Sequence, residues 1–231
     1  MLKRIKTKLK KLEREILYTK DGSTTIHLKD WDECYHSKFG AIQEAQHVFI
    51  KNGLSLFNDI PVCILEIGFG TGLNAFITFL ESQKSKLTID YVGVEAYPIS
   101  YDEVNKMNYV SELNAENGEA IFKKMHNCPW EKQVALTTNF KLTKRKQFFH
   151  EINDSEKFDL IYFDAFGYRV QPELWTLEIF QIMFKALKEN GVLVTYAARS
   201  IIKKNMIEAG FTVEKLQGPP GKREMFRATK L

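Results

Sequence analysis

The chain has 231 residues, a net charge of +4 and a hydrophobic fraction of 44%. This length is enough for one α/β domain with a sizeable core and a modest extension. No apolar run approaches the roughly 18 residues of a membrane span, and no signal-peptide hydrophobic region follows the basic N-terminus. These features predict a cytoplasmic protein that does not use a membrane as partner.

The three cysteines favour a reducing compartment over a disulfide framework, because they are odd in number and widely spaced. They are Cys34, Cys63 and Cys128. A metal site is the alternative, since Cys34 and Cys128 each lie two residues from a histidine, His36 and His126. Neither pair has the usual zinc spacing, and we therefore expect no metal.

Basic residues are concentrated at the two ends of the chain. Residues 1–20 carry eight Lys or Arg and two Glu, and residues 199–231 carry eight Lys or Arg and three Glu. The segment between them carries 17 basic and 24 acidic residues. An acidic body with basic ends indicates an anionic partner, with nucleic acid as the leading candidate. Solvated lysines that keep the protein in solution are the alternative.

Residues 1–57 are predicted to form a small extension ahead of the main domain at residues 58–231. Residues 2–16 place apolar residues at helical spacing between lysines, which fits a basic amphipathic leader helix. A β-hairpin follows, because β-forming residues 15–19 and 23–28 flank the turn sequence Lys20-Asp21-Gly22. The later part of residues 31–57 has a helical pattern and is expected to cap the open end of the main sheet.

The main domain begins with a buried strand, predicted over residues 62–67, that continues into a helix through three glycines. The junction reads Glu66-Ile67-Gly68-Phe69-Gly70-Thr71-Gly72-Leu73-Asn74. Such a turn forces the backbone into tight, partly positive-φ conformations and lets a nucleotide-type cofactor lie directly on the main chain. Plain turn glycines are the alternative.

The glycine spacing favours S-adenosyl-L-methionine over a dinucleotide, which requires G-x-G-x-x-G. A carboxylate at Glu66 would repel a pyrophosphate, but it can accept hydrogen bonds from the ammonium group of an amino acid. A second strand over residues 87–95 ends in Glu95, which is placed to bind both ribose hydroxyls. An NAD-dependent dehydrogenase is the least favoured function.

Strands and helices continue to alternate after this point. We predict helices from Pro98 to residue 104 and over residues 114–124, a third strand within 139–147, a fourth at 158–164, a helix over 172–188, a fifth strand at 191–197 and a helix over 200–209. An antiparallel pair, 211–216 and 222–229, closes the chain. This order predicts an α/β fold, a doubly wound Rossmann sheet of the methyltransferase type with a C-terminal antiparallel hairpin.

The third strand is followed by basic residues where many sites of this class carry an acid against the adenine amino group. The sequence there is Lys144-Arg145-Lys146. Adenine recognition is therefore expected to use backbone groups or aromatic faces.

Asp164 is the candidate catalytic residue. Ligands of open α/β sheets bind beyond the carboxyl ends of the strands, so Glu66, Glu95 and Asp164 are expected to share one crevice. A carboxylate beside a neutral amine holds the nitrogen and takes up the charge of its proton while the amine attacks a methyl sulfonium. An acid that merely caps a loop is the alternative.

Four further residues are candidates for binding a substrate. Phe166 and Tyr168 are placed to stack on a flipped-out base, although aromatic residues after a strand also occur as core residues. Lys222 and Arg223, beside a turn at the same end of the sheet, are candidates for holding a phosphate.

Several segments together resemble one family. They are the glycine segment 66–74, Phe163-Asp164-Ala165-Phe166, Pro172-Glu173-Leu174-Trp175-Thr176 and Gly221-Lys222-Arg223-Glu224-Met225. They resemble the methyltransferase domain of the tRNA 5-methylaminomethyl-2-thiouridine biosynthesis proteins, the MnmC/MnmD family. Tyr35-His36-Ser37 resembles the N-terminal signature of that family, with His36 where an aromatic residue is usual. The resemblance covers most of residues 30–231.

The resemblance implies methylation, with S-adenosyl-L-methionine as donor, of the 5-aminomethyl group on the wobble (2-thio)uridine of certain tRNAs. It implies that Asp164 faces the substrate amine. The implied cofactor contacts are Glu66, Gly68, Phe69, Gly70, Gly72, Asn74, Glu95 and Asp164. A separate flavin-dependent oxidoreductase, or another upstream modification enzyme, is the expected further partner.

Two other functions fit parts of the sequence. A small-molecule amine methyltransferase would use the same fold without needing the basic ends. A nucleic-acid-binding module with a degenerate cofactor site would keep its RNA affinity after Glu66→Ala and would not bind a methyl donor.

Overall fold

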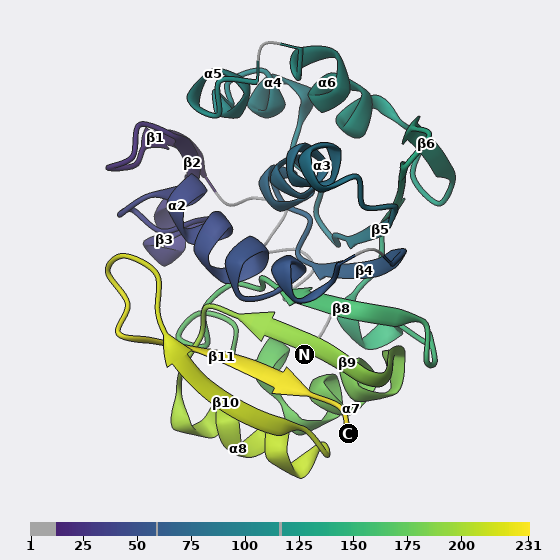
Figure 1. Cartoon of the computed structure of the whole chain (residues 1–231). Coiled ribbons are helices and arrows are strands. Elements are labelled where there is room, and N and C mark those ends of the chain that lie inside the picture. The colour runs from purple at the N-terminus through teal and green to yellow at the C-terminus, as the bar shows by residue number, and fades with distance from the viewer. Residues whose placement is uncertain (1–12, 59, 116) are drawn as a thin grey trace.

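A mixed β-sheet of eight strands lies at the centre of the molecule (Figure 1). The computed structural model describes residues 13–58, 60–115 and 117–231. In spatial order the strands are β10 (Thr212–Gln217), β11 (Glu224–Thr229), β9 (Leu187–Thr195), β8 (Phe158–Phe163), β4 (Val62–Ile67), β5 (Ile89–Val94), β7 (Phe140–Arg145) and β6 (Gln133–Thr137).

The five inner strands, β9, β8, β4, β5 and β7, are parallel. The outer pairings, β7 with β6, β9 with β11 and β11 with β10, are antiparallel. From β4 the chain adds β5 and β7 on one side and then returns to add β8 and β9 on the other. The strand order therefore reverses between β4 and β8, which is where open α/β sheets bind their ligands. The predicted doubly wound sheet and its C-terminal antiparallel hairpin are confirmed.

Helices cover both faces of the sheet because the inner strands are apolar on both faces. Alternation along β4 sends Ile64 and Glu66 to one face and Leu65 and Ile67 to the other. On the first face lie α2 (Ala41–Ala45), η2 (Gln46–Lys51), η3 (Leu54–Leu56), α3 (Leu73–Ser85), α4 (Tyr101–Val104), α5 (Tyr109–Glu112) and α6 (Glu119–Asn127). On the second lie η4 (Phe149–Glu151), η5 (Pro172–Trp175), α7 (Leu177–Ala186) and α8 (Ser200–Glu208).

A smaller three-stranded antiparallel sheet precedes the central one. It consists of β1 (Arg14–Tyr18), β2 (Thr24–Leu28) and β3 (Glu33–Cys34), with η1 (Lys29–Trp31) between the last two. The predicted hairpin turn is confirmed: Gly22 has a φ of +86°, and the Asp21 carboxylate accepts a hydrogen bond of 3.1 Å from the backbone N–H of Ser23. Most of the predicted leader helix lies outside the described residues, but its last residues belong to β1.

Three predicted helices have different limits in the structure. The first begins at Tyr101 and not at Pro98, because Ser100 caps it: the Ser100 hydroxyl accepts from the Glu103 N–H at 3.3 Å, and the Glu103 carboxylate accepts from the Ser100 N–H at 2.6 Å. The prediction over 114–124 is replaced by α5 and α6, since Asn114 adopts a φ of +50° between them. The prediction over 172–188 divides into η5 and α7.

The edge strand β6 is absent from the sequence-based prediction, and β9 starts four residues earlier than expected. None of the helices within the described ranges has the length and hydrophobicity needed to cross a lipid bilayer.

Candidate active site

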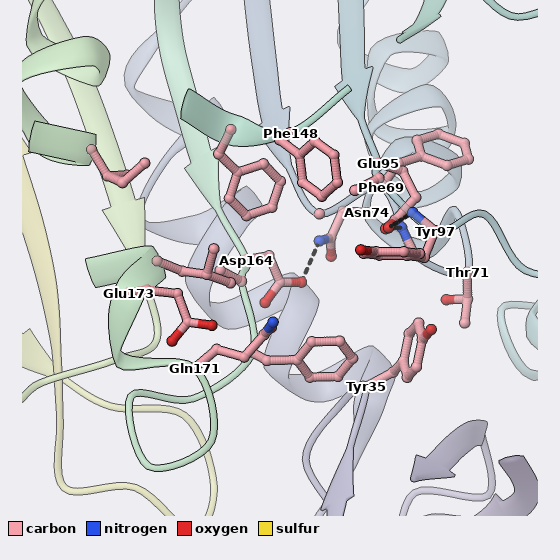
Figure 2. Close-up of a pocket in the computed structure, with 18 of the residues that line it drawn as sticks. Tyr35, Phe69, Thr71, Asn74, Glu95, Tyr97, Phe148, Asp164, Gln171 and Glu173 are labelled. Atoms are coloured by element: carbon pink, nitrogen blue, oxygen red, sulfur yellow. Dashed lines mark hydrogen bonds between the residues drawn. The ribbon is translucent and has the colours of Figure 1, made fainter. Parts of the chain in front are cut away.

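A pocket of about 350 Å³ opens at the carboxyl ends of β4, β5 and β8 (Figure 2). Its floor is the glycine loop between β4 and α3, and its sides are the segments that follow β5, β7 and β8. Tyr35 and His36, which follow β3, form its roof. Figure 2 shows Asn74 and Asp164 on one side of the pocket and Glu95 with Tyr97 on the other. The pocket therefore lies at the point where the strand order reverses.

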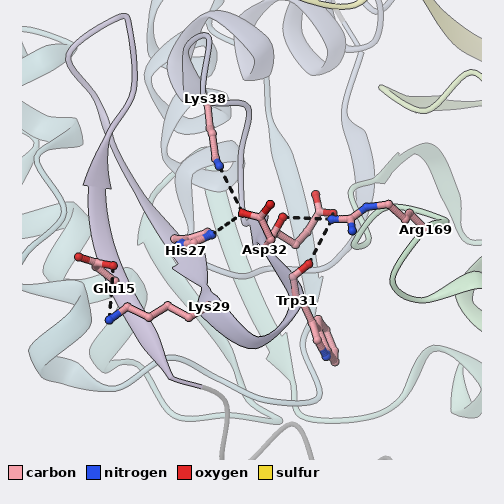
Figure 3. Close-up of polar contacts among 8 residues, drawn as sticks. Glu15, His27, Lys29, Trp31, Asp32, Lys38 and Arg169 are labelled. Carbon is pink, nitrogen blue, oxygen red and sulfur yellow. Dashed lines mark hydrogen bonds and ion pairs between the residues drawn. The ribbon is translucent and has the colours of Figure 1, made fainter.

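Arg169 holds the roof in place by joining the loop after β8 to the small sheet (Figure 3). Its guanidinium donates hydrogen bonds to the backbone oxygens of Trp31 and Asp32, both at 3.1 Å, and to the Glu33 carboxylate at 3.2 Å. Close by, the Phe166 ring packs edge-on against Trp31 and Tyr35, with centroid distances of 5.9 and 5.0 Å. The N-terminal sheet and the residues that follow it thus form the roof of the pocket.

Gly68 sits where the glycine loop passes against the strand end of β8. Its φ is +91°, and an added Cβ would lie 2.4 Å from the backbone oxygen of Asp164. No larger residue fits there without separating the loop from β8.

We expect Gly68→Ala to lower the free energy of unfolding by about 1–3 kcal/mol, because it combines a strained φ with a backbone clash. Calorimetric titration is expected to show weakened binding of S-adenosyl-L-methionine in the same variant. Gly167→Ala is the matched control, since the nearest atom to its added Cβ is 3.8 Å away. Equal stability of the two variants would contradict the role given to Gly68.

Glu66 is completely buried at the end of β4, and neither of its carboxylate oxygens has a hydrogen-bond partner among the described residues. The Asn74 side-chain oxygen and the Tyr91 hydroxyl are unpaired in the same way. Burial, together with the nearby Asp164 carboxylate, raises the pKa of Glu66 well above its ordinary value. Buried polar atoms without partners are rare in native proteins, so this cluster is suited to meeting a polar group of a ligand.

Asp164 is the first residue after β8. Its backbone N–H donates to the Ile67 oxygen at 2.9 Å, and its side chain accepts a hydrogen bond of 2.8 Å from the Asn74 amide. Burial, with Glu44 adding to it, raises the pKa of Asp164 to about 7, against the opposing effects of Asn74 and Lys222. A carboxyl that titrates near neutral pH is well matched to accepting a proton from an amine.

Glu95 is the first residue after β5 and faces the pocket from the other side. Its carboxylate accepts hydrogen bonds from the backbone N–H groups of Gly70 at 3.0 Å and Tyr97 at 2.8 Å. Burial raises its pKa. These contacts fix the acid beside the glycine loop, at the position expected for binding ribose hydroxyls.

An aromatic wall that sequence reasoning missed stands next to Glu95. Tyr97, Phe148, Phe149 and His150 all line the pocket. The Tyr97 and Phe148 rings meet edge-on at 5.9 Å, and the Phe148 and His150 rings stack at 5.5 Å. The sequence signal for this wall is the pair of phenylalanines shortly after the third parallel strand, β7.

The predicted site residues separate into three groups, of which the last lines a second cavity. Those that line the pocket are Gly68, Phe69, Gly70, Asn74, Glu95, Asp164 and Phe166. Gly72 instead caps α3, and Glu66 is completely buried at the end of β4 and is not among the residues that line the pocket.

Tyr168, Lys222 and Arg223 line a second, more open cavity of about 430 Å³. Tyr196 borders both cavities. Lys222 is not a free phosphate-binding cation, because its ammonium group pairs with the Glu44 carboxylate.

The cysteines Cys34, Cys63 and Cys128 carry free thiols. In the described part of the chain, no three or more His, Cys, Asp or Glu side chains gather in a way that would hold a metal ion.

A sequence profile of the S-adenosyl-L-methionine-dependent methyltransferases matches residues 109–231. Among curated proteins, the bifunctional protein MnmC for tRNA 5-methylaminomethyl-2-thiouridine biosynthesis from Hydrogenovibrio crunogenus is 27% identical over 93% of this chain and 34% of its own length. The protein of that name from Leptospira borgpetersenii is 29% identical over 84% of this chain and 32% of its own length. The chain thus spans about a third of the length of these relatives.

Two solved structures share the fold. MnmC2 from Aquifex aeolicus superposes with a TM-score of 0.76 at 24% identity, covering 94% of this chain and 70% of that one. Spermidine synthase from Thermotoga maritima superposes with a TM-score of 0.54 at 14% identity, covering 94% of this chain and 69% of that one.

The resemblance to the MnmC methyltransferase domain is confirmed by these matches. The glycine loop, the unpaired atoms at Glu66 and Asn74 and the carboxylate of Glu95 also fit the amino-acid and ribose ends of the methyl donor. Because the profile covers more than half of its residues, the chain belongs to the S-adenosyl-L-methionine-dependent methyltransferase family.

Proposed function

We propose that this methyltransferase acts on tRNA and N-methylates the 5-aminomethyl group of the wobble (2-thio)uridine. The observation that carries the proposal is the position of Asp164, which lines the glycine-loop pocket, while Tyr196 borders both that pocket and a basic second cavity. Its carboxyl titrates near neutral pH, with a pKa of about 7, as the acceptor of an amine proton should. The MnmC relatives are named for tRNA 5-methylaminomethyl-2-thiouridine biosynthesis, which supports an aminomethyl uridine of tRNA as the substrate.

Residues on three sides of the pocket would hold S-adenosyl-L-methionine. We assign its amino-acid end to the glycine loop and to the buried carboxyl of Glu66, and its ribose to Glu95. We assign the adenine ring to the aromatic wall of Tyr97, Phe148 and Phe149, because the residues directly after β7 are Lys146 and Gln147 and not an acid. The bound donor would supply an electrophilic methyl group.

Asp164 then has two tasks toward the substrate amine. Its carboxylate orients the nitrogen lone pair, and it accepts the proton that the nitrogen gives up. With the donor held in the pocket, its methyl group would be transferred to this nitrogen and the electron pair of the carbon–sulfur bond would stay on sulfur, so the task left to the chain would be to place the nitrogen and to take up its proton. The proton passes from nitrogen to Asp164 and then to solvent, which leaves the secondary amine.

The second cavity supports an RNA substrate through its charge. It is lined by Arg169, Arg199, Lys222 and Arg223 against the acids Glu33 and Glu224. Arg169 and Lys222 are engaged with Glu33 and Glu44, whereas Arg199 lies over the Tyr168 ring at 5.7 Å. We therefore assign phosphate contacts to Arg199 and Arg223, and a base contact to Tyr168.

Replacing both Arg199 and Arg223 by Gln is expected to lower the affinity for tRNA. It should also make the affinity less sensitive to the salt concentration. Removal of each phosphate interaction should flatten the slope of log Kd against log salt concentration by about 0.7–0.9. Filter binding over a range of salt concentrations measures this slope. Lys84→Gln, at the far end of α3, removes an exposed cation as control and should leave the slope unchanged. A slope that stays the same in the double variant would remove these arginines from the RNA interface.

The proposal is tested by incubating the protein with labelled methyl donor and tRNA that carries the 5-aminomethyl intermediate. We expect label in the wobble nucleoside and none in tRNA that lacks the aminomethyl group. The free 5-aminomethyluridine nucleoside serves as the competing substrate. Methylation of the nucleoside with none of the tRNA would instead identify a small-molecule amine methyltransferase.

Two wider proposals follow from the same function. We propose that this chain, because it acts on tRNA, is located in the cytoplasm. The relatives are named bifunctional, and we propose that the further step on this nucleotide, a flavin-dependent oxidoreductase reaction, is carried out by polypeptide outside these 231 residues.

A further inference from the structure

An ion pair between distant parts of the chain acts on the Asp164 carboxyl, although neither partner lines the pocket. The Lys222 ammonium group, in the turn between β10 and β11, contacts the Glu44 carboxylate of α2. Glu44 is buried, and its other oxygen accepts a hydrogen bond of 2.9 Å from the backbone N–H of Ser37. A buried carboxylate that is held by both a cation and an N–H group is fixed in one geometry, in contrast to a solvent-exposed surface ion pair.

The same lysine is joined to the backbone beside Asp164 through Tyr196. Its ammonium group lies 3.6 Å from the centroid of the Tyr196 ring, within the range of a cation–π contact. The Tyr196 hydroxyl donates a hydrogen bond of 2.8 Å to the backbone oxygen of Ala165. Displacement of Lys222 would therefore shift the Tyr196 ring and, through its hydrogen bond, the backbone at Ala165, the residue that follows Asp164.

The pair also sets two opposing charges close to Asp164. Glu44 disfavours the ionised form of that carboxyl, and Lys222 favours it. Burial is the larger influence and favours the neutral form. Without Lys222, burial and Glu44 would be opposed by the Asn74 hydrogen bond alone among these influences, and the pKa of Asp164 would rise further.

We propose that the Lys222–Glu44 pair is a positioning device that holds the Asp164 loop through Tyr196 and balances the charge of the Asp164 carboxyl. Neither partner lines the glycine-loop pocket, so both act through Asp164 and not on the substrate. The catalytic meaning of this assignment rests on the proposed function, whereas the contacts themselves do not.

Other polar groups also face Asp164 and must stay constant in a test. They are Asn74 from α3, Glu66 from β4, Tyr91 from β5 and Tyr196 after β9. Substitutions at Glu44 and Lys222 change the identity of none of these four residues, although Tyr196 loses its contact with the Lys222 ammonium group when that lysine is replaced.

The test is a pH titration of Asp164 in the ligand-free protein, followed by 13C NMR of aspartate carboxyl carbons. The Asp164 signal is identified by its loss in Asp164→Asn. We expect Lys222→Gln to move its titration midpoint about one pH unit upward and Glu44→Gln to move it about as far downward. The double variant Glu44→Gln/Lys222→Gln should lie between the two, and Lys222→Arg, which keeps the charge, should lie close to the parent protein.

Lys215→Gln is the matched control, because it removes an exposed cation from the same hairpin. A purely structural role for the pair would shift the midpoint in one direction for both single variants or not at all, and either result overturns the proposal. The measurement needs no substrate, so it can fail or succeed independently of methyl transfer to tRNA. If transfer is observed, the acidic limb of the kcat profile should shift in the same two directions.

Discussion

Replacing Asp164 by Asn is expected to lower kcat for methyl transfer to aminomethyl tRNA by about 100- to 10,000-fold. An amide cannot accept the proton of the substrate amine, although it keeps the shape and the hydrogen bond to Asn74. Affinity for S-adenosyl-L-methionine should change little, because the substitution leaves the glycine loop intact. Rapid-quench measurement of a single turnover separates these two effects.

The pH profile of the parent protein gives an independent check on Asp164. Because its pKa is raised to about 7, the carboxyl is protonated below that pH and cannot accept a proton. We expect kcat to fall as the pH is lowered through about 7 and this limb to be absent in Asp164→Asn. Asp90→Asn, at the opposite end of β5, serves as control. A variant at Asp164 with kcat within a few-fold of the parent would contradict the assignment.

Replacing Glu66 by Gln is expected to weaken binding of the methyl donor while changing the stability of the ligand-free protein little. In the ligand-free protein, burial raises the pKa of Glu66 well above its ordinary value, so Gln replaces an acid that is already largely neutral and the loss of its ability to ionise costs little. The amino-acid end of the methyl donor, in contrast, loses a charge-assisted contact. We expect Kd for S-adenosyl-L-methionine to rise about 10- to 100-fold in calorimetric titrations, while the ligand-free variant stays folded.

The sign of the pH dependence follows from the direction of the pKa shift at Glu66. Its pKa in the folded chain lies well above 4.5, so the folded protein retains a proton that the unfolded chain releases. The free energy of unfolding therefore falls as the pH rises above about 4.5, by about 1.4 kcal/mol per pH unit for each such proton. Denaturant unfolding of Glu66→Gln should show a shallower fall. An unchanged cofactor Kd together with an unchanged slope would refute this account of Glu66.

The parallel core of the fold and most of its glycine-loop pocket could be predicted from the sequence. Buried parallel strands are continuous apolar runs, and the acids that end them, Glu95 and Asp164, meet because the carboxyl ends of parallel strands share one edge. The glycine loop was recognisable because Gly68 adopts a backbone conformation that other residues rarely reach.

The surroundings of Asp164 could not be predicted, because they depend on contacts between remote segments. Lys222 and Glu44 are separated by 178 residues, and nothing in either local pattern indicates their pairing. The prediction that Lys222 holds a phosphate did not include this pair. The prediction that Phe166 stacks on a base did not include the edge-on contacts of its ring with Trp31 and Tyr35. Both roles stay predictions. The division of the chain at residue 57 stays a prediction.

The most direct test of the proposed mechanism is a crystal structure of the protein with S-adenosyl-L-methionine bound. We predict that the donor lies along the glycine loop with its ribose at Glu95 and its methyl group directed toward the side of the pocket that Asp164 occupies. A donor bound elsewhere, or one whose methyl group faces away from Asp164, would contradict the mechanism.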